Sequence, residues 1–144
     1  MPRRSPARRP PPPAAESDFL FAGLLAIHKS WAWVVVIGNG VAGVWGLGAQ
    51  AHEPLRTRAL WWFTAFVEFA IFVEVALGVG MVAGQDIEAP QFHMFYGFVA
   101  IIAVGIAYSY RQSEWVRQHI YGFYGGVGLF LMGLGIRAML LGQT

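Results

Sequence analysis

Four long apolar runs, separated by short polar connections, dominate the pattern of residues along this chain. Each run has the roughly 20 residues that a helix needs to cross the hydrocarbon core of a bilayer. The clearest is QFHMFYGFVAIIAVGIAYSYR, which has a polar start and ends in an aromatic belt followed by an arginine. The pattern predicts an all-α integral membrane protein, a four-helix transmembrane bundle with helices at about 19–49, 60–83, 91–110 and 120–141.

The segment before the first run has a different composition. It begins MPRRSPARRPPPPAA, and its arginines and prolines cannot bury enough apolar surface to form a packed core. We therefore predict a disordered N-terminal tail over residues 1–18 and a single transmembrane domain over residues 19–144. Because the first apolar run continues into a full span, we do not expect it to be a cleaved signal peptide.

The overall composition narrows the chemistry. Apolar residues make up 56% of the 144 residues and charged residues 12%, as expected for a chain surrounded by lipid. Since there is no cysteine, the chain can form no disulfide, thiolate metal site, iron–sulfur cluster or c-type haem attachment. The pI near 9.3 does not predict nucleic-acid binding, because the basic residues lie in the tail and at helix ends, where they set topology.

We expect a multi-pass protein of the cell membrane, surrounded by the lipid bilayer. The basic residues of the loops and those of the tail predict opposite orientations in the membrane. The first connection carries Arg56 and Arg58, and the third carries Arg111 and Arg117, so both are basic. The second connection carries Asp86 and Glu88 and is acidic. The positive-inside rule, applied to these short loops, places both termini outside. The four arginines of the tail argue for the reverse, so the sequence leaves the orientation open.

The first run contains a glycine motif that also occurs in dinucleotide-binding domains. Gly38, Gly40 and Gly43 have G-x-G-x-x-G spacing, but they are followed by AHEPLRTRALWWFTAFVEFAIF, which is a connection and another span. A dinucleotide-binding domain needs further strands that this chain has no room for. We interpret these glycines, and Gly122 and Gly126 in the last run, as small residues that let helices approach closely in lipid.

The four histidines fall into two pairs when the alternating direction of the spans is followed. We call the membrane face where the first helix starts side one, and the opposite face side two. His28 and His93 then lie near side one at comparable depth, and His52 and His119 lie near side two.

Each side-one histidine heads a stripe of mostly small residues at helical spacing. The stripes are Ala32, Val35, Asn39, Ala42 and Gly46 after His28, and Gly97, Ala100, Ala103 and Ala107 after His93. Small stripes usually face other helices, so we predict that both imidazoles point into the bundle. Two facing neutral imidazoles with space between them are what a haem iron needs. We therefore predict a haem b site with His28 and His93 as iron ligands; chance pairing of interfacial histidines is the alternative.

A haem also needs a cation near its propionates, and two residues are candidates. Arg137 is predicted to turn inward at side one, because it shares a helix face with small residues, and Lys29 is the second candidate. The face of the last helix consists of Gly122, Gly126, Phe130, Gly133 and Arg137.

The chain loosely resembles the di-haem b-type membrane cytochromes of the cytochrome b561 kind. The resemblance rests on His28, His93, the HMFYG start of the third run, and the two-sided distribution with His52 and His119. It implies electron transfer by haem held between histidine pairs in a helical bundle. That family generally uses more helices, and His52 and His119 lie at helix ends or in loops, so the side-one pair is the better match. In length and layout the chain also resembles small actinobacterial four-helix membrane proteins with no assigned role.

The second helix carries two carboxylates at membrane depth, Glu68 and Glu74. An ionised carboxylate in hydrocarbon costs about 2.5–3.5 kcal/mol, so each should be protonated, paired or facing a cavity. We predict an ion pair between Glu74 and Arg137, and we place Glu68 on the same helix face as Thr64, nearer side two.

Two other functions are alternatives to electron transfer. One is a small proton-coupled transporter using Glu74, because the chain resembles the small multidrug transporters in size, helix number and aromatic content. Their essential glutamate lies in the first helix, where this chain has Asn39. The other is an accessory subunit of a larger membrane complex, such as a respiratory assembly, or a homo-oligomer, docking through small-residue faces. An enzyme is not predicted, because none of the five serines has a histidine and an acid arranged around it.

Overall fold

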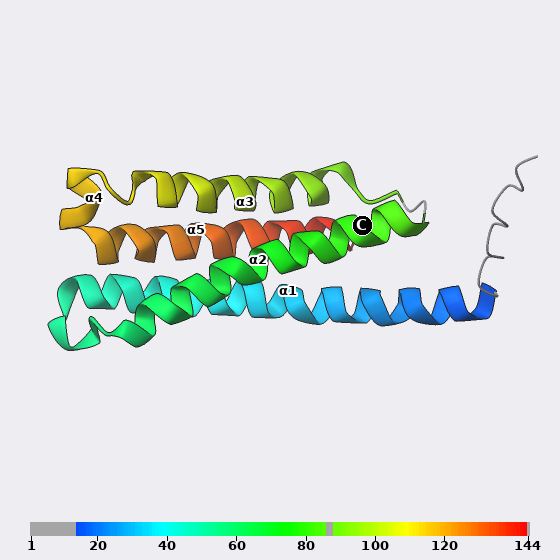
Figure 1. Cartoon of the computed structure of the whole chain (residues 1–144), viewed down its shortest axis with the longest axis horizontal. Helices are drawn as coiled ribbons and strands as arrows, with labels where there is room; N and C mark the ends of the chain where they lie inside the picture. The colour runs from blue at the N-terminus through cyan, green and yellow to red at the C-terminus, as the bar shows by residue number, and fades with distance from the viewer. Residues whose placement is uncertain (1–13, 86–87, 144) are drawn as a thin grey trace, which may run out of the picture.

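The computed structural model describes residues 14–85 and 88–143, and this part of the chain is all-α (Figure 1). Its elements are α1 (Ala14–Ala51), η1 (Glu53–Leu55), α2 (Arg58–Gln85), α3 (Gln91–Tyr110), α4 (Glu114–Gln118) and α5 (Ile120–Leu141). The helices α1, α2, α3 and α5 are each long and apolar enough to cross a membrane. The prediction of a four-helix transmembrane bundle is confirmed.

The helix boundaries agree closely with the sequence prediction, with two differences. The first is that α1 begins at Ala14 and so includes the end of the segment predicted as a disordered tail; residues 1–13 lie outside the described part of the chain. The second is the short helix α4 within the third connection. Ser113 caps this helix, because its hydroxyl accepts a hydrogen bond from the Val116 backbone N–H at 3.4 Å.

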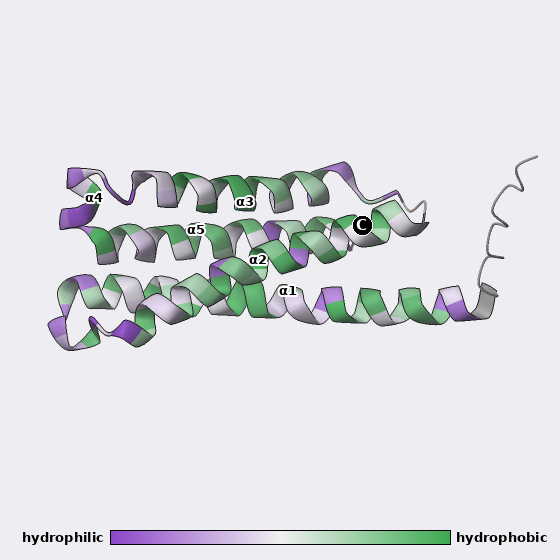
Figure 2. Cartoon of the chain, in the orientation of Figure 1, coloured by the Kyte–Doolittle hydropathy of each residue, from purple (hydrophilic) through white to green (hydrophobic). Residues whose placement is uncertain are grey.

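The outer surface of the bundle is apolar along most of its length. Trp33, Phe69, Phe98 and Phe130 are each more than half exposed, and polar residues gather in the connections between the long helices (Figure 2). A surface of this kind is unfavourable in water and suits contact with lipid. The chain is therefore a membrane protein.

The helix α5 packs against both α1 and α3, and α2 crosses α1 (Figure 1). The α1–α5 contact is the most extensive of these, and glycines of the two helices face each other in it. A Cβ atom at Gly46 would lie 2.9 Å from Cα of Gly125, and one at Gly128 would lie 2.8 Å from the carbonyl oxygen of Asn39. Because neither position has room for a larger residue, the two backbones can approach closely.

The G-x-G-x-x-G glycines of α1 also serve as helix contacts, as the sequence interpretation expected. A Cβ atom at Gly38 would lie 2.6 Å from Cγ1 of Val67 on α2. At Gly40 and Gly43 the nearest atoms belong to residues of α5. The motif therefore marks an apolar packing face of a transmembrane helix.

The middle of the bundle is filled by apolar side chains from all four long helices. We call this group the central apolar layer, and it consists of Val35, Ala70, Ile71, Ala100, Val104 and Leu131, each at most 6% exposed. On α2 this layer lies between Glu68 and Glu74. It therefore separates a polar region near side one from a polar region near side two.

Candidate functional site

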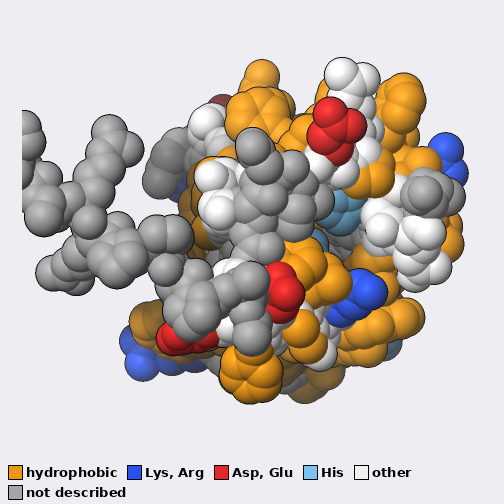
Figure 3. Space-filling view, turned by 90° about the vertical axis from the view of Figure 1, so that its right-hand side faces the viewer, with side chains coloured by type: hydrophobic (Ala, Val, Ile, Leu, Met, Phe, Trp, Pro, Cys, Tyr) orange, Lys and Arg blue, Asp and Glu red, His pale blue; other side chains and the backbone are white. Residues whose placement is uncertain are grey.

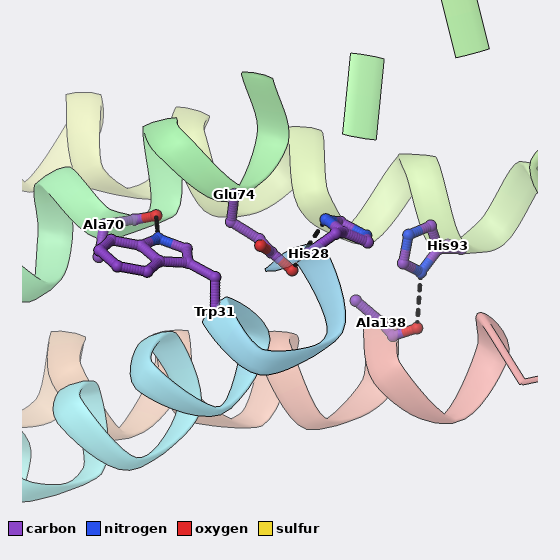
Figure 4. A network of polar contacts seen from close by, with 6 residues as sticks. All are labelled: His28, Trp31, Ala70, Glu74, His93 and Ala138. Carbon is purple, nitrogen blue, oxygen red and sulfur yellow. Dashed lines mark hydrogen bonds and ion pairs between the residues drawn. The ribbon is translucent and has the colours of Figure 1, made fainter. Parts of the chain in front are cut away.

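His28 of α1 and Glu74 of α2 meet in the half of the bundle nearer side one (Figure 4). His28 Nδ1 lies 3.2 Å from Glu74 Oε1, which is within ion-pair distance but lacks the direction of a hydrogen bond. The two side chains are 13% and 15% exposed. Close to this pair, Trp31 donates its Nε1–H to the Ala70 carbonyl oxygen at 2.9 Å, which links α1 to α2 beside the site.

His93 of α3 is held by the C-terminal part of α5. Its Nδ1 lies 2.8 Å from the carbonyl oxygen of Ala138, and a neutral imidazole can donate a hydrogen bond to this oxygen when Nδ1 carries the proton. A Cβ atom at Gly142 would lie 2.8 Å from the same nitrogen, so the ring needs a glycine there. The rings of His93 and His28 meet edge to face, with centroids 5.9 Å apart and planes at 81°.

Both imidazoles are therefore engaged through Nδ1, which leaves Nε2 of each ring for another ligand. One Nδ1 lies at ion-pair distance from a carboxylate and the other at hydrogen-bond distance from a backbone carbonyl; groups of these kinds orient metal-binding imidazoles when they accept a hydrogen bond from them. Figure 3 views the bundle from side one and shows histidine side chains visible between apolar ones. The pair thus lies close to the side-one surface without being fully exposed.

The helix faces predicted for the two histidines are confirmed. Both histidines are partly buried, and most of the stripe residues that follow them are buried in the bundle. The buried members are Val35, Asn39, Ala42, Gly46, Ala100 and Ala107. The alternating direction of the spans, together with helical periodicity, therefore predicted that His28 and His93 lie close together.

The partner predicted for Glu74 is wrong, because Glu74 pairs with His28 and not with Arg137. Arg137 is exposed on the outer face of α5, and Lys29 is exposed on α1. The structure brings neither cation into contact with the two histidines within the described residues.

The predicted inward face of α5 is confirmed only at Gly122, whose backbone N–H donates to Oε1 of Gln50 on α1 at 2.9 Å, and it is wrong over the rest of the helix. Gly126 and Gly133 have no atom within 4 Å of a Cβ position, and Phe130 is 55% exposed. The face that packs inward is Tyr124, Gly125, Gly128 and Leu131. The physical reason is that Gly125 and Gly128, in place of Gly126, meet the backbone of α1.

The side-two histidines do not form a comparable site. His52 and His119 are exposed, and no contact between them is found in the described part of the chain. The His119 ring stacks on Trp115 with centroids 5.1 Å apart, and its Nδ1 lies 3.0 Å from the Trp115 carbonyl oxygen. His119 therefore has a local partner within its own connection.

A second polar cluster, which the sequence reasoning missed, lies nearer side two. Glu68 is 2% exposed and shares its face of α2 with the buried Thr64, as predicted. The Tyr108 hydroxyl of α3 donates a hydrogen bond to the Glu68 carboxyl group. Tyr124 and Arg111 also lie close enough to interact electrostatically with Glu68. The polar sequence YSYR at the end of the third apolar run was the available signal for this cluster. Only the packing of α3 against α2 and α5 shows that Tyr108 of this sequence lies next to Glu68.

Comparison with protein-family models, with curated proteins and with solved structures finds no match to this chain. Its function therefore has to be inferred from its own residues.

Proposed function

We propose that this chain is a b-type haem protein of the cell membrane that transfers electrons, with His28 and His93 as the two axial ligands of the haem iron. One observation supports the proposal most. Two imidazoles from different helices, each engaged at Nδ1, face each other near one membrane face. Haem sites with two histidine ligands in helical bundles use this donor set.

The distance between the ring centroids is close to that of two ligands of one iron, but the edge-to-face arrangement would have to change so that both Nε2 atoms point at the metal. A metal ion about 2.0–2.1 Å from each imidazole nitrogen would place the ring centroids roughly 6 Å apart. The two centroids are 5.9 Å apart. No group of three or more histidine, cysteine, aspartate or glutamate side chains within the described residues could hold a metal ion. A macrocycle would therefore have to supply the remaining iron ligands.

Glycines lie beside both rings, and each ring fills the space that a side chain would take there. Gly78 of α2 faces His28, where a Cβ atom would lie 3.4 Å from Cε1, and Gly142 faces His93. On the last turns of α2, Gly80 has no atom within 4 Å of its Cβ position. Gly80 is exposed, so its open Cβ position lies on the outer surface, and a macrocycle would need the two rings and the helices that carry them to move apart.

A bound haem would supply a one-electron iron couple, and the surrounding residues would anchor and tune it. An ionised Glu74 beside His28 would favour the oxidised iron and lower the reduction potential. Arg137 precedes Ala138, whose carbonyl faces His93, and Lys29 follows His28. Both cations are exposed on the outer faces of their helices, so the propionates would have to reach outward to pair with them.

The test is an absorption spectrum of the purified full-length protein, oxidised and then reduced with dithionite, after expression with added haem. We expect the sharp reduced bands of six-coordinate haem b. His28→Ala and His93→Ala should each lose them, because each removes one axial ligand. The exposed His119 provides the matched control, and His119→Ala should retain the parent spectrum.

Two results would contradict the proposal. One is a haem spectrum that is unchanged in both His28→Ala and His93→Ala. The other is a colourless protein under conditions that load other b-type haem proteins. The latter would favour an accessory subunit or a transporter that uses Glu74.

A further inference from the structure

We propose that Glu68 is a proton-binding site inside the membrane that exchanges protons with water on side two. This inference does not depend on the proposed haem, since Glu68 lies across the central apolar layer from the two histidines. It rests on the partners of one buried carboxyl group and on the exposure of two of its neighbours, Tyr108 and Arg111, at the side-two end of α3.

The Glu68 carboxyl group is incompletely partnered. The Tyr108 hydroxyl donates a hydrogen bond to it, whereas Oε2 has no hydrogen-bond partner in the described part of the chain. The buried Tyr124 hydroxyl also lacks a partner there. One carboxyl oxygen is thus free to carry a proton, and a neighbouring hydroxyl is free to bond to it or to a bridging water.

The charges around Glu68 allow both the ionised and the neutral carboxyl group. The titratable and charged neighbours are Tyr108 and Arg111 from α3 and Tyr124 from α5. From α1 comes the neutral Asn39, whose Nδ2 donates to the Val67 carbonyl oxygen at 3.3 Å. The Tyr108 hydroxyl can donate to either form of the carboxyl group, and the positive Arg111 balances the charge of the ionised form.

The proton balance of the site is simple. A proton from side-two water adds to a carboxylate oxygen of Glu68 and forms an O–H bond, which converts the carboxylate into a neutral carboxyl group. Arg111 keeps its charge throughout and is exposed, so water can solvate it when its anionic neighbour is lost. Release of the proton reverses these changes, and no other group gains or loses a proton.

The residues around Glu68 indicate that it exchanges protons with the water on side two. Tyr108 is 41% exposed, and Arg111 follows the end of α3 in an exposed connection. In the other direction, the residues of the central apolar layer offer no polar side chain between Glu68 and Glu74. Protons can therefore reach Glu68 along the Tyr108 hydroxyl, whereas the route from side one is blocked by apolar packing.

The experiment is infrared spectroscopy of the full-length protein in lipid nanodiscs, recorded over a range of pH in H2O and in D2O. The difference between the parent and Glu68→Gln should contain the C=O stretch of a protonated carboxyl group, present at low pH and lost as pH rises. Glu74→Gln, a change at the other membrane-depth carboxylate, should retain this band. In Tyr108→Phe the titration midpoint should move to higher pH, because the ionised carboxylate loses its donor.

The position of proton entry is tested by the rate at which this carboxyl group exchanges hydrogen for deuterium. Tyr108→Phe should slow the exchange several-fold, and Tyr110→Phe, a change at a tyrosine that is 59% exposed on the same helix, should not. If Glu74→Gln slowed the exchange and Tyr108→Phe did not, entry would be from side one and the proposal would be wrong. It would also be wrong if no band distinguished the parent from Glu68→Gln at any pH. Should Glu68→Gln not fold, an identical titration in Tyr108→Phe and Tyr110→Phe would overturn the proposal.

Discussion

The two polar clusters of this bundle share the helix α2 but have different surroundings. Toward side two, Glu68 is 2% exposed, in the half where Gly46 and Gly125 bring the backbones of α1 and α5 into contact. Toward side one, the Glu74 side chain is 15% exposed. Gly80 and Gly84 beyond it have no atom within 4 Å of their Cβ positions.

This difference in packing decides how large a ligand each cluster can accept. Close packing leaves little volume for a ligand larger than a proton or a single water. Gly80 and Gly84 are exposed on the outer surface, so a larger group beside the imidazoles would need this less buried end of the bundle to open. We therefore propose a proton as the ligand of Glu68 and a haem as the ligand of the histidines beside Glu74. The two carboxylates, six residues apart in the sequence, would then have unrelated roles.

The largest effect is expected from filling the α1–α5 contact. Gly125→Leu would place a side chain where a Cβ atom already lies 2.6 Å from the Leu47 backbone nitrogen. Overpacking costs about 1–3 kcal/mol even where side chains can adjust, and here backbone atoms block the adjustment. We expect loss of monodisperse protein in size-exclusion chromatography and a much lower thermal midpoint. The neighbouring Gly126→Leu, in open space, should behave like the parent; equal damage from both would show that this contact does not determine the fold.

An intermediate effect is expected from exchanging each carboxylate for its amide. Partners of metal-binding imidazoles usually contribute about 10–100-fold in affinity. Glu74→Gln should therefore weaken haem binding by about that factor, measured by absorbance titration of the haem-free protein. Glu68→Gln should leave the affinity unchanged, because the central apolar layer lies between Glu68 and the histidines. Equal losses in the two variants would mean that the clusters act as one site.

The smallest effect is expected from the two tyrosines next to Glu68. Tyr108→Phe removes the hydrogen bond to the carboxyl group, and such bonds contribute about 0.6 kcal/mol on average within membranes. Tyr124→Phe should change the free energy of unfolding by less, since the Tyr124 hydroxyl has no partner in the described structure. Unfolding in mixed detergent micelles would measure both. A larger loss in Tyr124→Phe would indicate a bridging water or a second hydrogen bond at that hydroxyl.

Much of the candidate site followed from the sequence. Antiparallel spans place His28 and His93 near the same membrane face, and helical spacing places both on stripes of small residues that pack inward. The groups that lie beside their Nδ1 atoms, a backbone carbonyl and a carboxylate, could not be predicted in the same way. The Ala138 carbonyl has no sequence signal, because every residue has one, and the sequence pattern had indicated Arg137 as the partner of Glu74, where the structure has His28.

The face of α5 shows most clearly where sequence reasoning failed. This helix has glycines on several sides, among them Gly122, Gly125, Gly126 and Gly128, so its periodicity permits more than one inward face. Which face packs inward depends on how α5 is rotated and shifted against α1. The prediction chose the face with Gly126 and Arg137, and both residues lie on the outside.

The number of spans, their approximate ends, and the depth and membrane side of each ionisable residue were determined by the sequence itself. These properties depend on the thickness and polarity of the bilayer, which act on each segment separately. Only the tertiary structure decided the rotation of each helix and therefore the partners of Glu68, Glu74 and Arg137. Rotation is set by the fit of side chains between helices far apart in the chain, and in lipid no difference in hydrophobicity selects one apolar face over another.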